Sequence, residues 1–425
     1  MQSPVQPFFS ILIPTRQRHT TLHYSIKTVL AQNYQDFELV IMDNCSSPET
    51  REVADSFKDQ RIAYYRSERR LSMTENWELG LSKTKGRYIT VIGDDDGLLP
   101  KALSNCFDLI TQYQVNIVSW YRWPYFWPNA PQQQNSLYIP FSSQVHLRNG
   151  KDFLSKVYRY EISYEHLPML YNSFVSKELV QEIKLKNEGH YYSENCFCPD
   201  VFSGAANAFF CGDYIHSDRP FSLSGISASS NLSISISTNS QPEKLARQEE
   251  SKQQLHPSLK VPENADRFTS LAISSDFLWA KNIFFPTHNL EVSLSGAIQD
   301  LLDRVNHDPD KYESFLETAK KMILTFGLDP SLFRVSPKSI AQSIANPPSR
   351  WLGNPNSPTG IVLNCKLLNI DNVYEALLLC YKVMIGEIRY VVKDNQPYVD
   401  LSDLNISIEK EELDLRSSRS QVTYF

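Results

Sequence analysis

Short apolar runs alternate with helical stripes over the first 120 residues of the chain. Between the first two runs, Leu22, Ile26 and Val29 recur at the spacing of one helical face, and similar stripes separate the later runs. This alternation of strand and helix predicts an open, mostly parallel α/β sheet with helices on both faces. The predicted strands lie at residues 9–13, 37–42, 62–65, 88–92 and 115–119.

The pattern changes after the last of these runs. Residues 121–150 are rich in aromatic residues and proline, which predicts an irregular insertion packed on the sheet. Nine serines fall within residues 222–240, and a polar stretch follows them. We therefore divide the chain into a first domain at 1–225, a serine-rich loop and polar linker at 226–255, and a C-terminal region at 256–425.

The C-terminal region has helical periodicity. Apolar positions share one face over residues 298–305, and again over 312–323, where Gly327 is placed to end the helix. We expect a mainly helical appendage to the sheet domain. Dimerisation and acceptor docking are two roles open to it.

Composition and charge narrow the class of protein. The chain of 425 residues carries a net charge of -6, which is not the electrostatic footprint of a nucleic-acid-binding protein. Its seven cysteines are scattered without a CxxC pair, which favours a reducing cytoplasm. No apolar run reaches the roughly 18 residues of a membrane span, and the N-terminus lacks the basic region of a signal peptide. We expect a cytoplasmic protein with at most peripheral contact with a membrane.

Polar side chains follow three of the predicted strands. In an open parallel sheet, ligands bind beyond the carboxyl ends of the strands, so these positions are candidates for a site. The first strand is followed by Pro14, Thr15, Arg16 and Arg18, the second by Asp43 and Asn44, and the fourth by Asp94, Asp95 and Asp96.

The aspartate triplet, Asp94 to Asp96, points to a metal site. Adjacent carboxylates raise one another's pKa unless a cation lies among them. Mg²⁺ or Mn²⁺ would supply that charge, since these ions bind through one or two carboxylates and complete their shell with substrate phosphates. The triplet is thus a candidate site for a metal that holds a diphosphate. An ordinary surface turn is the alternative.

Four motifs in order carry a family resemblance. The segments "FFSILIPTRQR", "QNYQDFELVIMDNCSSPET", "DQRIAYYRSERRLSMTENWELGLSKTKGRYI" and "GDDDGLLP" resemble the nucleotide-binding half of bacterial family-two glycosyltransferases. The resemblance covers residues 7–110 and, less closely, 190–215. It implies the A-type, Rossmann-like glycosyltransferase fold. It also implies inverting, metal-dependent transfer of a sugar from a nucleoside diphosphate sugar to an acceptor hydroxyl.

The resemblance assigns roles to the residues at the strand ends. Asp95 matches a metal ligand, and Asp94 and Asp96 flank it in the metal site. Either of these two flanking residues could contact the ribose or the second phosphate. The chain departs from the usual motif at Gly93, where many relatives carry the first aspartate. The nucleotide would lie beside Pro14, Thr15, Arg16 and Arg18, with Asp43 or Asn44 accepting a hydrogen bond from the nucleobase. Apart from the resemblance, the basic residues Arg66, Arg69 and Arg70 precede a predicted helix and could bind the diphosphate; a solvated face is their alternative role.

A further acidic residue is needed outside the metal site. An inverting transfer requires a general base that removes the acceptor proton. The segment "CPDVFS" places Asp200 at the start of a helix, where the family carries its base, and Glu194 is the second candidate. Helix capping is the alternative role for Asp200. His216 is a candidate third metal ligand, with a structural role as its alternative.

The sequence therefore predicts a metal-dependent glycosyltransferase of polysaccharide or glycoconjugate synthesis. Its partners would be a nucleotide sugar and a glycan or lipid-linked acceptor, and its location the cytoplasm or the inner face of the membrane. A sugar nucleotidyltransferase is one alternative, although "PTRQRHT" has no glycine-rich loop. A catalytically inactive protein that binds nucleotide sugars or acts as a scaffold is the other.

Overall fold

The predicted alternation of strands and helices builds the first half of the protein. The computed structural model describes residues 6–230, 253–262, 269–306, 309–338, 347–354, 357–388, 390–393 and 396–399. The elements in order are β1 (Phe9–Thr15), α1 (His19–Leu30), β2 (Phe37–Asp43), α2 (Pro48–Ser56), β3 (Ile62–Arg66), α3 (Met73–Lys83), β4 (Tyr88–Val91), β5 (Gly97–Leu98), α4 (Ala102–Tyr113) and β6 (Ile117–Trp120).

The main sheet has eight strands in the order β3-β2-β1-β4-β10-β6-β11-β9. Strands β1, β2, β3 and β4 pair in parallel, and so do β6 and β11 (Asp213–Ser217). Two later strands, β10 (Ser173–Ser176) and β9 (Val145–Asn149), are antiparallel to their neighbours. The sheet is therefore the mostly parallel α/β sheet that the sequence predicts.

Alternate side chains of the central strands enter two different cores. Ile11 and Ile13 of β1 pack with the helices α1 and α4, whereas Leu12 between them packs with Trp77 and Leu81 of α3. All three β1 side chains are fully buried, and each burial stabilises the fold by about 1.5–3 kcal/mol. A strand buried on both faces has a continuous apolar sequence, which explains the runs at β1 and β2.

A second sheet of six strands packs beside the first, in the order β13-β14-β8-β7-β12-β5. The prediction of an irregular insertion at 121–150 is wrong, because this segment supplies strands to both sheets. Proline and aromatic residues concealed the strand pattern there. The strands not yet given are β7 (Trp123–Phe126), β8 (Ser136–Pro140), β12 (Ser222–Ile226), β13 (Arg350–Asn354) and β14 (Ser357–Asn364).

The C-terminal region begins with the predicted helices. These are α10 (Thr269–Phe284), α11 (Leu294–Asp303) and α12 (Tyr312–Phe326), the last ending at Gly327 in the left-handed conformation, with φ of +62°. Helix α10 packs against α7 (Pro199–Phe210). The same region also contains strands, since β14 pairs with β8 and α13 (Val373–Met384) packs on α1.

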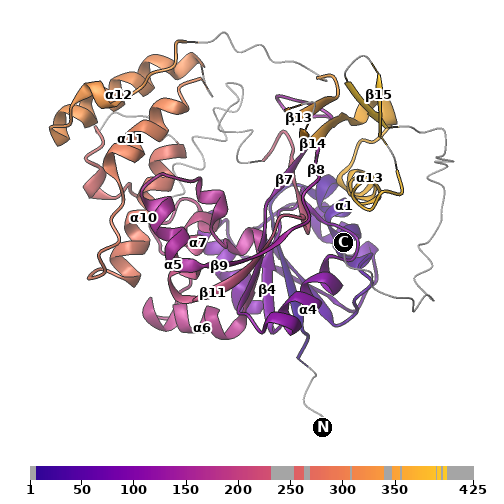
Figure 1. Ribbon diagram of the computed structural model, residues 1–425. Helices are drawn as coiled ribbons and strands as arrows, with labels where there is room; N and C mark the ends of the chain where they lie inside the picture. The colour runs from indigo at the N-terminus through magenta and orange to yellow at the C-terminus, as the bar shows by residue number, and fades with distance from the viewer. Residues whose placement is uncertain are drawn as a thin grey trace.

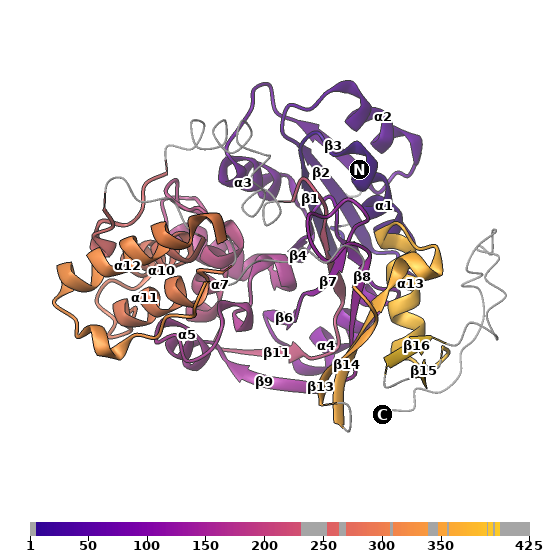
Figure 2. The ribbon, with the colours of Figure 1, turned by 90° about the horizontal axis from the view of Figure 1, so that it is seen from above.

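The two parts of the C-terminal region lie on opposite sides of the main sheet (Figure 1), and Figure 2 shows the same separation from above. The remaining elements are α5 (Gly150–Tyr158), α6 (Lys177–Lys186), β15 (Tyr390–Lys393) and β16 (Gln396–Val399), with short 3₁₀ turns between them. Most of the predicted linker, residues 231–252, lies outside the described residues. Within the described parts of the chain, no helix is both long and apolar enough to cross a bilayer.

Candidate active site

Three strands end at one edge of the main sheet and bring the predicted polar residues together. Thr15 of β1 lies beside Asp43 of β2 in the parallel register. The Thr15 hydroxyl donates a hydrogen bond of 2.7 Å to Asp94, which follows β4. The carboxyl ends of β1, β2 and β4 thus form a single cluster of buried polar groups at the edge where ligands bind in an open α/β sheet.

A guanidinium group neutralises part of the aspartate triplet. Nη1 of Arg18 lies 2.8 Å from Asp94 Oδ1 and 3.7 Å from Asp95 Oδ2. Burial by itself would lower the pKa of Arg18, but the charges of Asp94 and Asp95 outweigh it and raise that pKa. The cation that the three adjacent carboxylates require is, in this structure, a side chain of the protein.

The third carboxylate of the triplet, Asp96, turns away from Arg18. It accepts hydrogen bonds from the backbone N–H of Gly93 at 2.6 Å and of Gly225 at 2.7 Å, and from the Tyr171 hydroxyl. Burial and the neighbouring Asp95 raise the pKa of Asp96 to about 7. Both Asp96 oxygens therefore support the fold around the site.

The middle carboxylate, Asp95, retains an acceptor oxygen. Its Oδ2 accepts a hydrogen bond of 2.6 Å from the Ser227 hydroxyl. No donor among the described residues reaches its Oδ1, although the side chain of Asp95 is only 5% exposed. Burial, more than any nearby charge, raises the pKa of Asp95. An oxygen of this kind is suited to a cation or a donor group of a ligand.

Glycine at two positions allows the triplet to pack in this way. A Cβ at Gly93 would lie 2.9 Å from Asp96 Oδ2, so the inward position of Asp96 depends on the missing side chain. At Gly225 a Cβ would lie 1.6 Å from the backbone oxygen of Asp95. Gly225 belongs to strand β12, Ser222–Ile226, which is in direct contact with the triplet.

Gly225→Ala is expected to lower the free energy of unfolding by about 2–5 kcal/mol, because β12 must move away from Asp95 and leave the Asp96 carboxylate short of a donor. Urea denaturation measures the change. Ser224→Ala in the same strand is the control and should remain close to wild type. Equal stability of the two variants would contradict the close approach of β12.

The two candidates for base recognition differ in what already binds them. The Asn44 amide pairs with the backbone of Leu71, accepting from its N–H at 2.7 Å and donating to its carbonyl at 2.8 Å. Asn44 therefore fixes the loop before α3, which includes Arg70. Asp43 is fully buried and accepts hydrogen bonds from Ser46 N–H and the Tyr64 hydroxyl, with Arg66 at 3.5 Å.

The remaining residues after β1 lie at the same edge. Pro14 lies within β1. Arg16, which is half-buried, is the first residue after that strand. Arg70 is half-buried in the loop that Asn44 holds. The structure thus gathers the predicted donor-side residues around the ends of β1 and β2.

The candidate general base, Asp200, is linked to the triplet through Arg122 and Tyr171. Asp200 stands in the first turn of α7, with its side chain 23% exposed, and its Oδ2 is 3.4 Å from Nη1 of Arg122. The guanidinium of Arg122 lies over the Tyr171 ring, 4.8 Å from its centroid, and Tyr171 in turn binds Asp96. Glu194 is exposed in the loop before α7.

Arg122 and Tyr171 join the two halves of the site, and the sequence reasoning missed both. Arg122 lies two residues after the end of β6, a strand-end position that could have identified it. Tyr171 precedes the antiparallel strand β10, and nothing in the local sequence distinguishes it.

His216 is not brought into contact with the triplet by any interaction of the described residues. It lies in β11, where its Nδ1 is 2.9 Å from Ser119 Oγ and its ring packs edge-on against Tyr121. Burial, more than the nearby Arg148, lowers the pKa of His216 to about 2. In the described part of the chain, no three His, Cys, Asp or Glu side chains form a group that could hold a metal ion.

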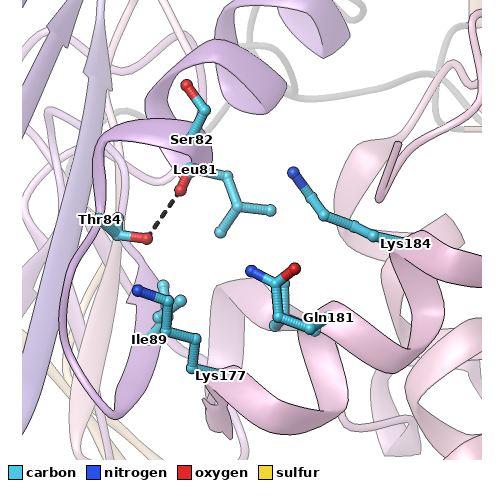
Figure 3. Close-up of a pocket in the computed structure, with 8 residues that line it drawn as sticks. Leu81, Ser82, Thr84, Ile89, Lys177, Gln181 and Lys184 are labelled. Atoms are coloured by element: carbon cyan, nitrogen blue, oxygen red, sulfur yellow. Dashed lines mark hydrogen bonds between the residues drawn. The ribbon is translucent and has the colours of Figure 1, made fainter. Parts of the chain in front are cut away.

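A small pocket of about 100 Å³ lies between α3 and α6, away from these residues. Figure 3 shows Lys177, Gln181 and Lys184 of α6 facing Leu81 and Thr84 across it. Lys184 is already paired with Glu78 at 2.7 Å. None of the predicted site residues lines this pocket, so it is not the candidate active site.

Comparison with known proteins finds similarity in the sheet domain. Residues 10–179 match the family model for glycosyl transferase family 2. One relative is the GalNAc(5)-diNAcBac-PP-undecaprenol beta-1,3-glucosyltransferase of Campylobacter jejuni, with 33% identity over 101 residues. The alignment covers 23% of this chain and 33% of the relative. A second relative is glycosyltransferase GlyG of Streptococcus pneumoniae, with 23% identity over 111 residues. That alignment covers 26% of this chain and 37% of GlyG. These matches span about a third of each relative's length.

Among solved structures, S. aureus TarS in complex with UDP-GlcNAc is similar over 76% of this chain and 93% of that chain, with 14% identity and a TM-score of 0.43. Asp200 lies beyond the range that the family model matches.

Proposed function

We propose that the protein transfers a sugar from a nucleoside diphosphate sugar to an acceptor hydroxyl, because residues 10–179 match the family model for glycosyl transferase family 2. The observation that carries the proposal is the convergence of Thr15, Arg18 and Asp43 with the aspartate triplet at one edge of the sheet. Acidic and cationic groups at such an edge suit a nucleotide and its diphosphate.

The nucleoside would lie along the ends of β1 and β2. Asp43 is the better candidate for binding the nucleobase, because the carbonyl and the NH₂ group of the Asn44 side chain are both hydrogen-bonded to the backbone of Leu71. A carboxylate that already accepts from Ser46 and Tyr64 still has lone pairs for a base N–H. Thr15, Arg16 and Pro14 would contact the nucleotide beside it.

The diphosphate would lie near Arg18, Asp94 and Asp95. Mn²⁺ or Mg²⁺ fits the donor set here, because such ions need only one or two carboxylates besides phosphate and water. Asp95 would supply its uncommitted Oδ1, and Asp94 would share the ion, since Asp96 is committed to Gly93, Gly225 and Tyr171. When bound, the ion would neutralise the charge that develops on the leaving diphosphate.

Arg18 would have to release Asp94 and Asp95 for these two carboxylates to hold an ion. In the structure its guanidinium forms ion pairs with Asp94 and Asp95 and also donates a hydrogen bond to the carbonyl of Ser229. A guanidinium released from the carboxylates would be placed to bind a phosphate in the bidentate manner typical of arginine.

Asp200 would act as the general base of an inverting transfer. It would take the proton of the acceptor hydroxyl while that oxygen bonds to the anomeric carbon and the bond from this carbon to the diphosphate breaks on the opposite face. Its partial exposure gives an acceptor access to it, and Arg122 orients it. Glu194, exposed in the preceding loop, is the second candidate.

The acceptor is proposed to be a glycan or a lipid-linked sugar in polysaccharide or glycoconjugate synthesis. The C. jejuni relative is named for a transfer that involves an undecaprenol-linked sugar. We place the reaction in the cytoplasm or at the cytoplasmic face of the membrane.

A thermal-shift screen of UDP, GDP and dTDP sugars with and without Mn²⁺ tests the donor site. A ligand present at 100 times its Kd should stabilise the native state by about 2.7 kcal/mol. Donors that stabilise the protein are then assayed for nucleoside diphosphate release with glycan and lipid-linked acceptors. Absence of any shift with the whole panel would refute the donor site, and formation of a nucleotide sugar from a nucleoside triphosphate would favour the nucleotidyltransferase.

A further inference from the structure

A fully buried carboxylate in the C-terminal region binds the loop that precedes the candidate base. Asp276 of α10 has no solvent exposure. Its Oδ1 accepts a hydrogen bond of 2.9 Å from Phe197 N–H, and its Oδ2 accepts one of 2.7 Å from Cys198 N–H. Those two residues are followed directly by Pro199 and Asp200 at the start of α7.

Thr74 and Gln253 hold the same loop at Cys196. The Thr74 hydroxyl of α3 donates a hydrogen bond of 2.9 Å to the carbonyl of Cys196, and the Gln253 amide donates to that carbonyl too. Since Pro199 has a fixed φ, fixing residues 196–198 fixes where α7 begins. The direction of the Asp200 side chain follows from that starting point.

A buried carboxylate is a costly way to join two helices. Removing an ionised group from water costs several kcal/mol unless hydrogen bonds and charge compensate it. Burial raises the pKa of Asp276, and the two backbone N–H groups act in the opposite direction. The N-terminal end of α7 supplies further positive potential.

Packing between α10 and α7 does not depend on Asp276. Ile273, Phe277 and Ala280 of α10 lie in one apolar core with Phe202 of α7. The Phe202 and Phe284 rings also contact each other, with centroids 5.6 Å apart. An apolar residue at 276 would suit this interface, so the carboxylate is better explained by its bonds to the loop.

We propose that Asp276 is a positioning residue that sets the N-terminus of α7 and so directs the Asp200 carboxylate toward the acceptor. The proposal rests on the proposed function, in which Asp200 is the base. It gives the first C-terminal helix a part in the transfer reaction.

Asp276→Asn keeps the side-chain size and one acceptor oxygen but loses one of the two backbone hydrogen bonds. We expect kcat to fall about 10- to 100-fold, because a displacement of about 1 Å in a reacting group costs up to about a hundredfold. The donor Kd, measured by calorimetry, should stay within twofold, since Asp276 has no contact with the donor-side residues.

Leu271→Ala separates this effect from a loss of stability. Leu271 is a buried residue of α10 that packs with α11 and α12 instead of the loop. The Leu271→Ala variant should lower the denaturant midpoint at least as much as Asp276→Asn does. Its kcat, measured under conditions where both variants are folded, should stay near the wild-type value. A kcat for Asp276→Asn that matches that of Leu271→Ala would overturn the positioning role.

The double variant with Asp200→Asn completes the test. If Asp276 acts through Asp200, adding Asp276→Asn to Asp200→Asn should change kcat by less than twofold. Additive losses would show that Asp276 acts elsewhere and would overturn the proposal. Failure of the proposed function would give a different result. Either the wild-type protein would show no sugar transfer, or the Asp200→Asn variant would keep the wild-type kcat.

Discussion

Asp200→Asn is expected to lower kcat by about 10² to 10⁴, the usual contribution of general acid-base catalysis. The amide keeps the size of the side chain and its place in the first turn of α7, but it cannot take up the proton of the acceptor hydroxyl. Donor binding should not change, because Asp200 contacts Arg122 and not the residues at the ends of β1 and β2. The measurement is kcat together with the donor Kd.

The control for this prediction is Glu194→Gln, which removes the other candidate base six residues earlier. It should leave kcat near wild type, because Glu194 is exposed in the loop. If Asp200→Asn is fully active and Glu194→Gln is not, Glu194 is the base and Asp200 serves only the helix.

Asp95→Asn is expected to remove the coupling between Mn²⁺ and donor binding and to lower turnover roughly a thousandfold, which corresponds to about 4 kcal/mol of transition-state stabilisation. The asparagine can still accept the hydrogen bond from Ser227, so β12 should keep its place. The neutral group, however, can no longer attract a divalent ion. Calorimetric titration of the donor with and without Mn²⁺ measures the coupling.

Asp108→Asn, on the exposed face of α4, is the matched control for the loss of one negative charge. Its Mn²⁺-dependent donor binding should equal that of wild type. If Asp95→Asn retains the same coupling, the ion is not held by the triplet, and Arg18 would be the group that neutralises the diphosphate.

Much of the fold and part of the site could be predicted from local sequence. Strands β1 and β2 are buried on both faces, so their runs are continuously apolar, and the helical stripes between them show the 3.6-residue period. Once the sheet is predicted, the polar residues that follow its strands must share one edge. The sequence alone therefore predicts that Thr15, Asp43 and Asp94 lie together.

Contacts between distant segments were decided only by the tertiary structure. The pairing of β14 with β8, the approach of Gly225 to Asp95 and the binding of Phe197 and Cys198 by Asp276 join residues that no local period connects. Each depends on which surfaces meet once the sheets and helices have packed.

The use of each carboxylate was decided in the same way. The sequence shows three adjacent aspartates with the same chemistry, and from it alone a metal was the expected counter-charge. In the folded protein, Asp94 pairs with Arg18 and accepts a hydrogen bond from Thr15, and Asp96 accepts hydrogen bonds from backbone N–H groups. Asp95 keeps one oxygen that can bind a ligand. The sequence by itself determines which charges are present at the edge of the sheet, whereas the tertiary structure decides their partners, because hydrogen bonds and ion pairs depend on distances of a few ångströms between segments far apart in the chain.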